Sequence, residues 1–450
     1  MRLTHPAPPP ASRHRSPGRL AALGTAALLL AASGPPAAAQ PATSVAYPAG
    51  ATATRFTGSA FDTCTAPSLT AMRAWRASPY RAVGVYVSGV NRTCAQPRLT
   101  ASWVRSVSAA GFRLLPIHKG LQPPCGARAR DAKISRTPAK AREQGTAAAQ
   151  DAVARGRALG MRPGSAFYND IEHYAQTDTG CRTAVLSYLS SWTRELHRTG
   201  HLSGVYMNLG QGAKQLSDAY TSTRYARPDA LWVARYDRVA SLTGWRGVPA
   251  TRWAAHQRAK QYRGTHDERH GGVTISIDGN RVDAPVATVA HTYRVTGAGP
   301  LLVRSGPSPA YTVLRSHAAG ASLAVVCQTP GPAVGRTRVW NLLAGGGYVT
   351  DHQVTTPSAT GYSAPLPRCS HPYQTTEPGG GLAERTGPGV SYPVRARLPQ
   401  GSLAWVTCQR TGSDVGGTRV WNRLANGRYA TDRHVATPGT TGFSAPLPRC

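Results

Sequence analysis

Between Phe56 and about Ala290, short apolar runs alternate with longer amphipathic stretches. Short, mainly apolar runs are typical of buried strands, and the longer stretches between them are typical of helices. The expected strands are GSAFD (58–62), AVGVYVSG (82–89), FRLLPIHK (112–119), SAFYNDIE (165–172), SGVYMNL (203–209), ALWVARYD (230–237), RWAAHQ (252–257) and GVTISID (272–278). The expected helices include Ser68–Ala77, Ala101–Ala110, Ala139–Leu159, Arg182–Thr199 and Gly212–Tyr220. This alternation predicts an α/β domain, a (β/α)8 TIM-like barrel over residues 56–290, and a doubly wound open sheet is the alternative.

The pattern changes after residue 300, where short runs rich in Val, Leu and Tyr are separated by Gly-Pro and Gly-Gly pairs. The segment TRVWNLLAGGGYVTD (337–351) recurs as TRVWNRLANGRYATD (418–432), and GYSAPLPRC (361–369) recurs as GFSAPLPRC (442–450), both 81 residues later. Without a helical period, this duplication predicts two small all-β barrels, at 295–370 and 376–450. Such small domains usually need a covalent link. The two cysteines of each repeat therefore predict Cys327–Cys369 and Cys408–Cys450.

The other four cysteines lie in the barrel region and, by exclusion, pair there. Cys64–Cys94 would join the loops after the first two strands, which leaves Cys125–Cys181 to join the loops after the third and fourth. No C-x-x-C pair occurs, so neither a zinc ribbon nor a thioredoxin-like motif is indicated.

The first 39 residues have the pattern of a secretory signal peptide. Arginines at 13, 15 and 19 precede the apolar stretch Leu20–Ala32, and Ala37-Ala38-Ala39 fits a cleavage site. Residues 40–55 are small and polar and predict a linker. No later apolar run approaches 18 residues, so we expect an exported chain without a transmembrane segment, extracellular or associated with the cell wall.

The net charge is +32, of which the signal region contributes four arginines and no acid. A strongly positive field favours polyanionic partners, although arginine-rich codon usage is an equal explanation. The chain lacks helix-turn-helix, zinc-finger and RNP patterns, so nucleic acid is not expected. An anionic bacterial envelope suits an exported protein better. We expect a monomer that needs no cofactor.

Four acidic residues stand where the expected strands end. Asp62 ends the first strand, Asp170 and Glu172 end the fourth, and Asp278 ends the last. Active sites of α/β barrels are built at the carboxyl ends of the strands. Glycosidic cleavage needs two carboxyl groups, one donating a proton and one acting as base or nucleophile. Asp170 and Glu172 are two residues apart and so share a face of their strand. A helix cap or salt bridge is the plainer explanation for any single acid.

Aromatic residues are frequent near the same strand ends: Tyr86, Tyr168, Tyr174, Tyr206, Trp232 and Tyr236. They could stack on sugar rings, or they could pack in the core. His118 at a strand end is more simply structural than catalytic. The spacing of His256, His266 and His270 does not predict a metal site.

Several segments together resemble a secreted actinobacterial glycoside-hydrolase-like family, formerly a domain of unknown function. They are FDTCTAPS (61–68), YRAVGVYVSG (80–89), LPIHKG (115–120), FYNDIEHY (167–174), SGVYMN (203–208), LWVARY (231–236), QYRG (261–264) and TISIDGNRVD (274–283). The order of Asp, D-x-E, Q-Y and I-D is also similar to family 25 lysozymes, which cleave peptidoglycan.

By position, that resemblance makes Glu172 the acid and gives Asp170 the role of orienting the substrate. Asp62 and Asp278 would stabilise positive charge at the anomeric carbon. Tyr86, Tyr206, Tyr236 and Gln261 would contact the substrate. Two positions depart from the lysozyme pattern, namely Asn169 and Lys260.

The repeats resemble bacterial SH3-like domains of wall-associated proteins. The first repeat carries the resemblance in Val303-Arg304-Ser305-Gly306-Pro307, Tyr311, Trp340 and Tyr348. The second departs at Ala383 and Glu384. The resemblance implies binding to wall glycopeptide, whereas Trp340 and Trp421 are more simply core residues.

The sequence therefore predicts an exported glycoside hydrolase acting on peptidoglycan or another wall polysaccharide, with a wall-binding tail. The alternative is a degenerate barrel that binds wall glycan without cutting it. The departures at Asn169 and Lys260 favour this alternative, and the four strand-end acids favour the enzyme.

Overall fold

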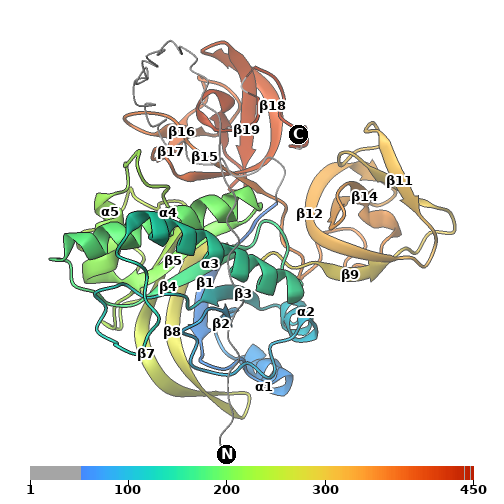
Figure 1. The fold of residues 1–450 in the computed structure, drawn as a ribbon. Helices are drawn as coiled ribbons and strands as arrows, with labels where there is room; N and C mark the ends of the chain where they lie inside the picture. The colour runs from blue at the N-terminus through green and yellow to red at the C-terminus, as the bar shows by residue number, and fades with distance from the viewer. Residues whose placement is uncertain (1–51, 440, 446) are drawn as a thin grey trace, which may run out of the picture. The chain divides into compact units, whose positions relative to one another are not determined.

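The computed structural model describes residues 52–439, 441–445 and 447–450, so the expected signal peptide and most of the expected linker lie outside the described residues. Eight strands form a closed barrel in chain order (Figure 1). They are β1 (Thr54–Asp62), β2 (Ala82–Ser88), β3 (Arg113–His118), β4 (Ala166–Ile171), β5 (Leu202–Asn208), β6 (Ala230–Ala234), β7 (Arg258–His270) and β8 (Val273–Val286). The closed barrel excludes the open-sheet alternative, and the first six strands coincide with the expected runs to within a few residues.

The layout differs from a (β/α)8 barrel in its last quarter. β1 to β7 are parallel neighbours, but β8 runs antiparallel to both β7 and β1. Within the barrel, whose strands are all described, helical segments follow only the first five strands. They are α1 (Leu69–Ala74), η1 (Trp75–Ala77), α2 (Ala101–Ala109), α3 (Pro138–Ala158), α4 (Thr179–Arg198), η2 (Leu209–Ala213) and α5 (Lys214–Asp218). The predicted closed barrel is therefore confirmed in its first six strands and corrected in its seventh strand, in the direction of β8 and in its last connections.

The expected strand at 252–257 is wrong, because these residues form a turn before β7. Trp253, Ala255 and His256 have φ angles of 49°, 55° and 69°, in the left-handed region that a strand does not use. The Trp253 side chain is buried, and its Nε1 donates a hydrogen bond to the Pro228 carbonyl at 2.8 Å. An apolar residue that anchors a turn thus gave the segment the appearance of a buried strand.

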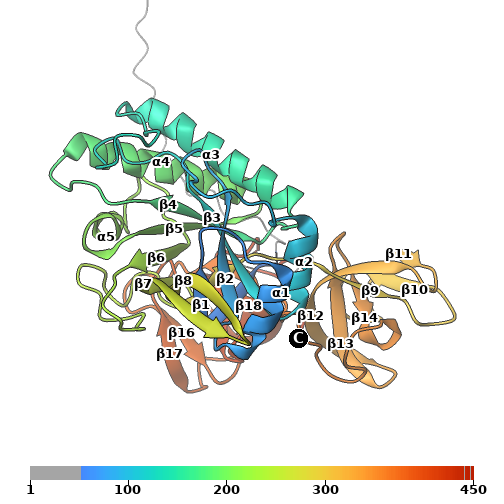
Figure 2. The same cartoon turned by 90° about the horizontal axis from the view of Figure 1, so that it is seen from below.

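The two longest helices, α3 and α4, lie side by side along one side of the barrel (Figure 2). Gly145 in α3 allows this close approach, because a Cβ there would lie 2.1 Å from the Tyr188 carbonyl oxygen in α4. Side-chain caps fix two helix starts, since Thr100 accepts from Trp103 N at α2 and Asp178 from Cys181 N at α4. Each of these helices begins at the end of a loop that leaves the mouth of the barrel, so the caps also fix one end of these loops.

Small residues inside the barrel make room for large aromatic rings. The buried interior residues contributed by neighbouring strands include Ala60, Ala82, Ala166, Ala230 and Ala259. Trp232 fills the space they leave and makes edge-to-face contacts with Tyr168 and Tyr206, at centroid distances of 5.6 and 5.4 Å. This aromatic layer lies beneath the strand-end acids and excludes water from one side of them.

Each repeat forms a six-stranded antiparallel sheet, and the two sheets have the same strand order. The first contains β9 (His291–Arg294), β10 (Leu301–Arg304), β11 (Val313–His317), β12 (Ser322–Val334), β13 (Thr337–Leu343) and β14 (Tyr348–Thr350), with η3 (Asp351–Gln353). The second contains β15 (His371–Gln374), β16 (Leu382–Arg385), β17 (Val394–Leu398), β18 (Leu403–Val415), β19 (Thr418–Leu424) and β20 (Tyr429–Thr431), with η4 (Asp432–His434). Trp340 and Trp421 are buried at equivalent positions, so they are core residues.

The structure contains the four predicted disulfides. Cys64–Cys94 and Cys125–Cys181 link loops of the barrel, while Cys327–Cys369 and Cys408–Cys450 each close a loop within one repeat. Among the described residues, no helix is both long and apolar enough to cross a membrane.

Candidate active site

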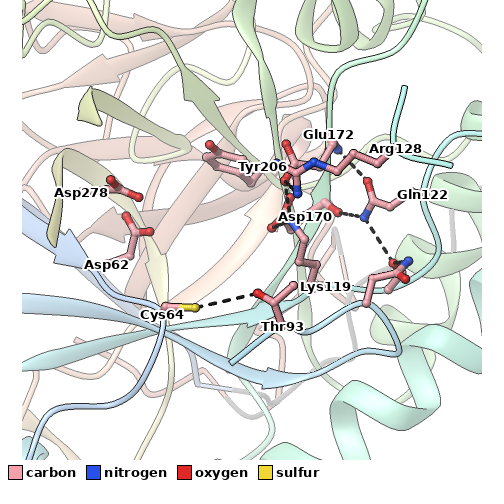
Figure 3. Close-up of polar contacts among 12 residues, drawn as sticks. Asp62, Cys64, Thr93, Lys119, Gln122, Arg128, Asp170, Glu172, Tyr206 and Asp278 are labelled. Carbon is pink, nitrogen blue, oxygen red and sulfur yellow. Dashed lines mark hydrogen bonds and ion pairs between the residues drawn. The ribbon is translucent and has the colours of Figure 1, made fainter. Parts of the chain in front are cut away.

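Two of the four acids come from adjacent strands at the mouth of the barrel. Asp62, the last residue of β1, is paired in register with Asp278 of β8. Because β8 is antiparallel, Asp278 lies within its strand rather than at the end of a parallel one. The prediction placed Asp278 at the mouth for the wrong reason, since β8 starts beyond the mouth and runs down into the barrel. Figure 3 shows the two carboxyl groups side by side.

The other two acids are joined by a lysine. Lys119 directly follows β3, and its Nζ donates to Asp170 Oδ2 at 3.0 Å and also to Glu172 Oε1. Both acids therefore point to the same side of β4, as their spacing predicted. Burial alone would lower the pKa of Lys119, but the two carboxylates outweigh burial and raise it. The lysine is thus a fixed positive charge between Asp170 and Glu172 (Figure 3).

All four carboxyl groups converge on one tyrosine. Burial, and then the charges of Asp170, Asp62, Asp278 and Glu172, raise the pKa of Tyr86 far above its usual value. Charges act in this way only over short distances, so all four acids lie in the neighbourhood of Tyr86. Tyr86 is half-buried in the wall of a cavity of about 310 Å³, which Asp62 and Asp278 also line.

The two pairs of acids have different surroundings. Burial, reinforced by the charge of Asp278, raises the pKa of Asp62 to about 7, despite hydrogen bonds from Gln261 and Asn280 that favour its ionised form. Burial also raises the pKa of Asp278. The pKa of Asp170 is raised to about 6 by burial, and Lys119 limits that rise. Near neutral pH a proton therefore resides on the Asp62–Asp278 pair, whereas the charge of Lys119 favours the ionised form of Asp170.

Gln261 links the first pair of acids to two tyrosines. Its Nε2 donates to Asp62 Oδ1 at 3.0 Å and to Asp278 Oδ2 at 3.3 Å. The hydroxyls of Tyr206 and Tyr236 both donate to its Oε1, at 2.7 and 2.9 Å. This arrangement fixes the orientation of the amide, so Gln261 positions the acids in addition to its expected contact with substrate.

Below Asp62, a short chain of hydrogen bonds reaches the aromatic layer. Asn280 Nδ2 donates to Asp62 Oδ1 at 2.6 Å, and Trp232 Nε1 donates to Asn280 Oδ1 at 2.9 Å. These residues are buried. The carboxyl group of Asp62 is therefore held from below by groups that cannot leave the core.

The structure divides the expected aromatic residues into two groups. Tyr168, Tyr174 and Trp232 are buried and belong to the core. Tyr86 and Tyr206 are partly exposed beside the acids, and Tyr236 is 62 % exposed at the rim. Of these six residues, only the second group is accessible beside the acids.

The two departures from the lysozyme pattern contact residues other than the four acids. Asn169 Nδ2 lies 3.2 Å from the hydroxyl of Tyr188 in α4, on the helix side of β4. Lys260 Nζ donates to both carboxylate oxygens of Asp237, at 2.7 and 2.9 Å, and holds the loop after β6. Both side chains therefore support the wall of the barrel rather than the acids.

His118 is also structural. It is buried, its Nδ1 lies 2.7 Å from Ser88 Oγ, and burial lowers its pKa to about 4. A second contact, to Asp151, uses the same Nδ1 at 3.7 Å. The three residues therefore lack the two-sided arrangement of a Ser-His-Asp triad, in which the base bonds to its partners through different nitrogens. In the described ranges, no group of three or more His, Cys, Asp or Glu residues is placed to hold a metal ion.

Sequence reasoning missed the residues that hold the second pair of acids. Lys119 lies within the LPIHKG segment, directly after β3, and the rule that found the acids at strand ends would have found it if applied to cations. Gln122 gave no such signal. Its side chain donates to the Asp170 carbonyl at 2.8 Å and accepts from Glu172 N at 2.9 Å, so a loop residue fixes the backbone between the acids.

Residues 73–282 match the model of a family described as Rv2525c-like, glycoside hydrolase-like domain. The chain therefore carries an Rv2525c-like, glycoside hydrolase-like domain. The matched range includes Asp170, Glu172 and Asp278, whereas Asp62 lies before its first residue. Among curated proteins, none matches the chain.

Solved structures similar to this glycoside hydrolase-like domain include three with related descriptions. The Tat-secreted protein Rv2525c of Mycobacterium tuberculosis, in complex with L-tartrate, is 17% identical, with a TM-score of 0.36, and the match covers 50% of this chain and 96% of that one. The catalytic domain of endolysin ply40, from bacteriophage P40 of Listeria monocytogenes, is 14% identical, with a TM-score of 0.33 and coverages of 50% and 93%. A muramidase from Acremonium alcalophilum is 13% identical, with a TM-score of 0.30 and coverages of 50% and 92%. Similarity at this level says nothing about the reaction.

The raised pKa of Asp62 predicts a pH-dependent effect of Asp62→Asn on stability. Since the folded protein favours the protonated form, Asp62 stabilises the fold fully below pH 4 and loses this contribution as the pH rises through about 7. Asn resembles the protonated form, so the variant should unfold at a higher temperature than the wild type at pH 8. A pKa shift of this size corresponds to a few kcal/mol at most, roughly.

Thermal unfolding at pH 4 and pH 8 measures this difference. At pH 4 the variant and the wild type should unfold at nearly the same temperature. The exposed Asp267 provides the matched control, and Asp267→Asn should show no such pH-dependent gain. An Asp62→Asn variant that is destabilised equally at both pH values would contradict a raised pKa.

Proposed function

We propose that the barrel domain hydrolyses a glycosidic bond of a cell-wall glycan, with peptidoglycan as the first substrate to test. One observation carries this proposal, namely two pairs of carboxyl groups in contrasting surroundings, of which Asp62 and Asp278 line the cavity while Asp170 and Glu172 are held by Lys119 in its opposite wall. Carboxyl groups in different environments within one site are the usual basis for assigning an acid and a base. The match to a glycoside hydrolase-like family supports the same reaction class.

Asp62 suits the role of proton donor. Its pKa of about 7 lets it hold a proton near neutral pH, which is the range in which a general acid is most effective. Although Asp62 is only 2 % exposed, it lines the cavity, which Asp170 does not, and its proton can pass to a glycosidic oxygen there. Asp278 beside it carries negative charge after the proton leaves and would stabilise positive charge on the sugar.

Glu172 suits the role of base or nucleophile. Lys119 donates to it, and Arg128 Nη1 lies 3.8 Å from its Oε1, so two cations lie beside this carboxyl group. Its side chain is one-third exposed, whereas Asp170 is almost fully buried. Asp170 therefore positions Lys119 and the substrate, while Glu172 can reach a water molecule or the anomeric carbon. The resemblance to lysozymes assigned the donor role to Glu172, and Lys119 is the physical reason for exchanging the roles.

A protein that binds wall glycan without cutting it is the competing function. Asn169 and Lys260, the residues that favoured it, contact the barrel wall and not the acids.

We propose as well that the chain is exported and that its repeats, similar to SH3-like domains, bind the wall. Residues 295–450 contain 14 arginines and only five acidic residues, which suits an anionic envelope. Four disulfides suit an oxidising compartment.

Release of reducing ends from purified sacculi by the mature protein tests the proposal, and pelleting with the same sacculi tests binding. We expect reducing ends to accumulate with time, and pelleting to weaken as salt rises from 0.1 to 1 M, because charge attraction is screened over about 3 Å at 1 M. Pelleting without any reducing ends would support the binding protein instead. If the protein neither cleaves nor pellets, both functions are wrong.

A further inference from the structure

The wall of the cavity that faces Asp62 and Asp278 is positively charged. Lys119, Arg92 and Arg128 line it, and they come from three different segments. Lys119 follows β3, Arg92 lies after β2, and Arg128 lies between β3 and α3. Figure 3 shows Lys119 and Arg128 on the side of the cavity away from the two aspartates. A glycosidase needs carboxyl groups, but nothing in the cleavage of a neutral sugar requires two arginines beside them.

The two arginines make only weak contacts with the described residues. Arg92 Nη1 lies 3.4 Å from the carbonyl oxygens of Tyr86 and Val87, near the limit for a hydrogen bond. Arg128 Nη1 lies 3.8 Å from Glu172 Oε1, and its side chain is 53 % exposed. Each guanidinium carries five N–H donors in a planar fork. Most of these donors remain available to a ligand in the cavity.

A disulfide ties this wall to the acids. Cys94 lies two residues after Arg92, Cys64 lies two residues after Asp62, and the two cysteines are bonded. Thr93, next to Arg92, lines the cavity and lies 3.9 Å from Cys64 Sγ. The segment that carries Arg92 therefore has little freedom to move away from Asp62. Groups held in place before binding lose less entropy when a ligand arrives.

We propose that Arg92 and Arg128 bind a free carboxylate carried by the sugar next to the scissile bond. This inference rests on the proposed glycosidase function and names its substrate class, a glycan with ionised carboxyl groups on its sugars. A carboxylate accepts two parallel hydrogen bonds from one guanidinium, which gives both affinity and orientation. In wall glycan, the sugars present such a group where the peptide has been removed, because the carboxyl is otherwise part of an amide bond. The preferred wall substrate is therefore glycan that a peptide-removing hydrolysis has already exposed.

Three substrates test the proposal: intact peptidoglycan, glycan strands freed of their peptides, and the same strands with their carboxyl groups converted to amides. We expect kcat/KM to be at least tenfold higher for the free-carboxylate strands than for the amidated strands. In the double variant Arg92→Gln/Arg128→Gln, this ratio should fall below threefold. The double variant Arg73→Gln/Arg105→Gln removes the same charge from exposed helix positions and should keep the ratio.

A wild-type ratio near one, or a ratio unchanged in the cavity variant, would overturn the proposal. A wild type that prefers intact peptidoglycan would show that any carboxylate recognised belongs to the peptide, which also overturns it. If none of the three substrates is cleaved, the proposed glycosidase function is wrong, whatever the cavity arginines bind. Equilibrium dialysis of the free and amidated strands then still decides the carboxylate site, since the same tenfold preference is expected in binding.

Discussion

Asp62→Asn is expected to lower the turnover of wall glycan by 10²–10⁴-fold, the usual contribution of general acid catalysis. The variant keeps the size of the side chain but removes the proton that the leaving oxygen needs. From an activated aryl glycoside, the phenolate leaves without being protonated, so turnover of that substrate should fall by less than about tenfold. Glu172→Gln should lower turnover of both substrates, because a base or nucleophile is needed whatever the leaving group is.

Steady-state rates on both substrates measure this contrast, with Asp267→Asn as a control that removes an exposed acid. The opposite pattern, in which Glu172→Gln spares the aryl glycoside and Asp62→Asn does not, would return the donor role to Glu172. The pH profile is an independent measurement. Activity should fall as the pH rises through about 7, where Asp62 loses its proton, and this descending limb should be missing in Asp62→Asn.

Lys119→Met is expected to destabilise the protein by about 3–5 kcal/mol at pH 7, the usual effect of removing one partner of a buried ion pair. The side chains of Lys119 and Asp170 are 9 % and 3 % exposed, so without the lysine a carboxylate stays buried without a counter-charge. At pH 4 much of the loss should disappear, because Asp170 then takes up a proton. The second variant Lys119→Met/Asp170→Asn should recover stability at pH 7 for the same reason.

Urea unfolding followed by tryptophan fluorescence at both pH values gives these differences. Lys140→Met is the matched control, since Lys140 pairs with Glu143 on the surface of α3, where water and salt screen the pair and its loss should change stability little at either pH. An equal loss at pH 4 and pH 7 would mean that Lys119 contributes packing rather than charge. In that case the effect of the Lys119 charge on the pKa of Asp170 would lose its support.

The sequence predicted the first six strands because each is a short buried run between polar or helical segments. It failed near the seventh, where Trp253 gave a turn the apolar character of a strand. It also failed on direction in β8, because alternating burial looks the same whichever way a strand runs. The apolar runs do not show whether one strand is joined to the next by a helix or by a hairpin turn. The hairpin between the last two strands could therefore not be predicted.

The candidate site was predictable in its acids and not in the groups that tune them. Strand-end positions identified Asp62, Asp170 and Glu172, since the ends of neighbouring parallel strands meet at one mouth. The environment of each acid depends on side chains that arrive from loops, such as Gln122, and on a lysine whose partners are 51 and 53 residues away. These long-range pairings decide which acid holds the proton, and no local pattern encodes them.

The β7–β8 hairpin separates the position of an acid from the length of the cavity wall beside it. It projects beyond the other strands (Figure 1), its tip is Gly271-Gly272 with φ angles of 54° and 81°, and Thr265 and Ser276 line the cavity from its two arms. Asp278 lies lower on the same hairpin, in register with Asp62. Because pairing with β1 holds the lower part of the hairpin in place, residues added in pairs near the tip would lengthen one wall of the cavity without moving Asp278. If the proposed function holds, evolution or design can thus change the length of glycan that the site accommodates while Asp62 and Asp278 stay where they are.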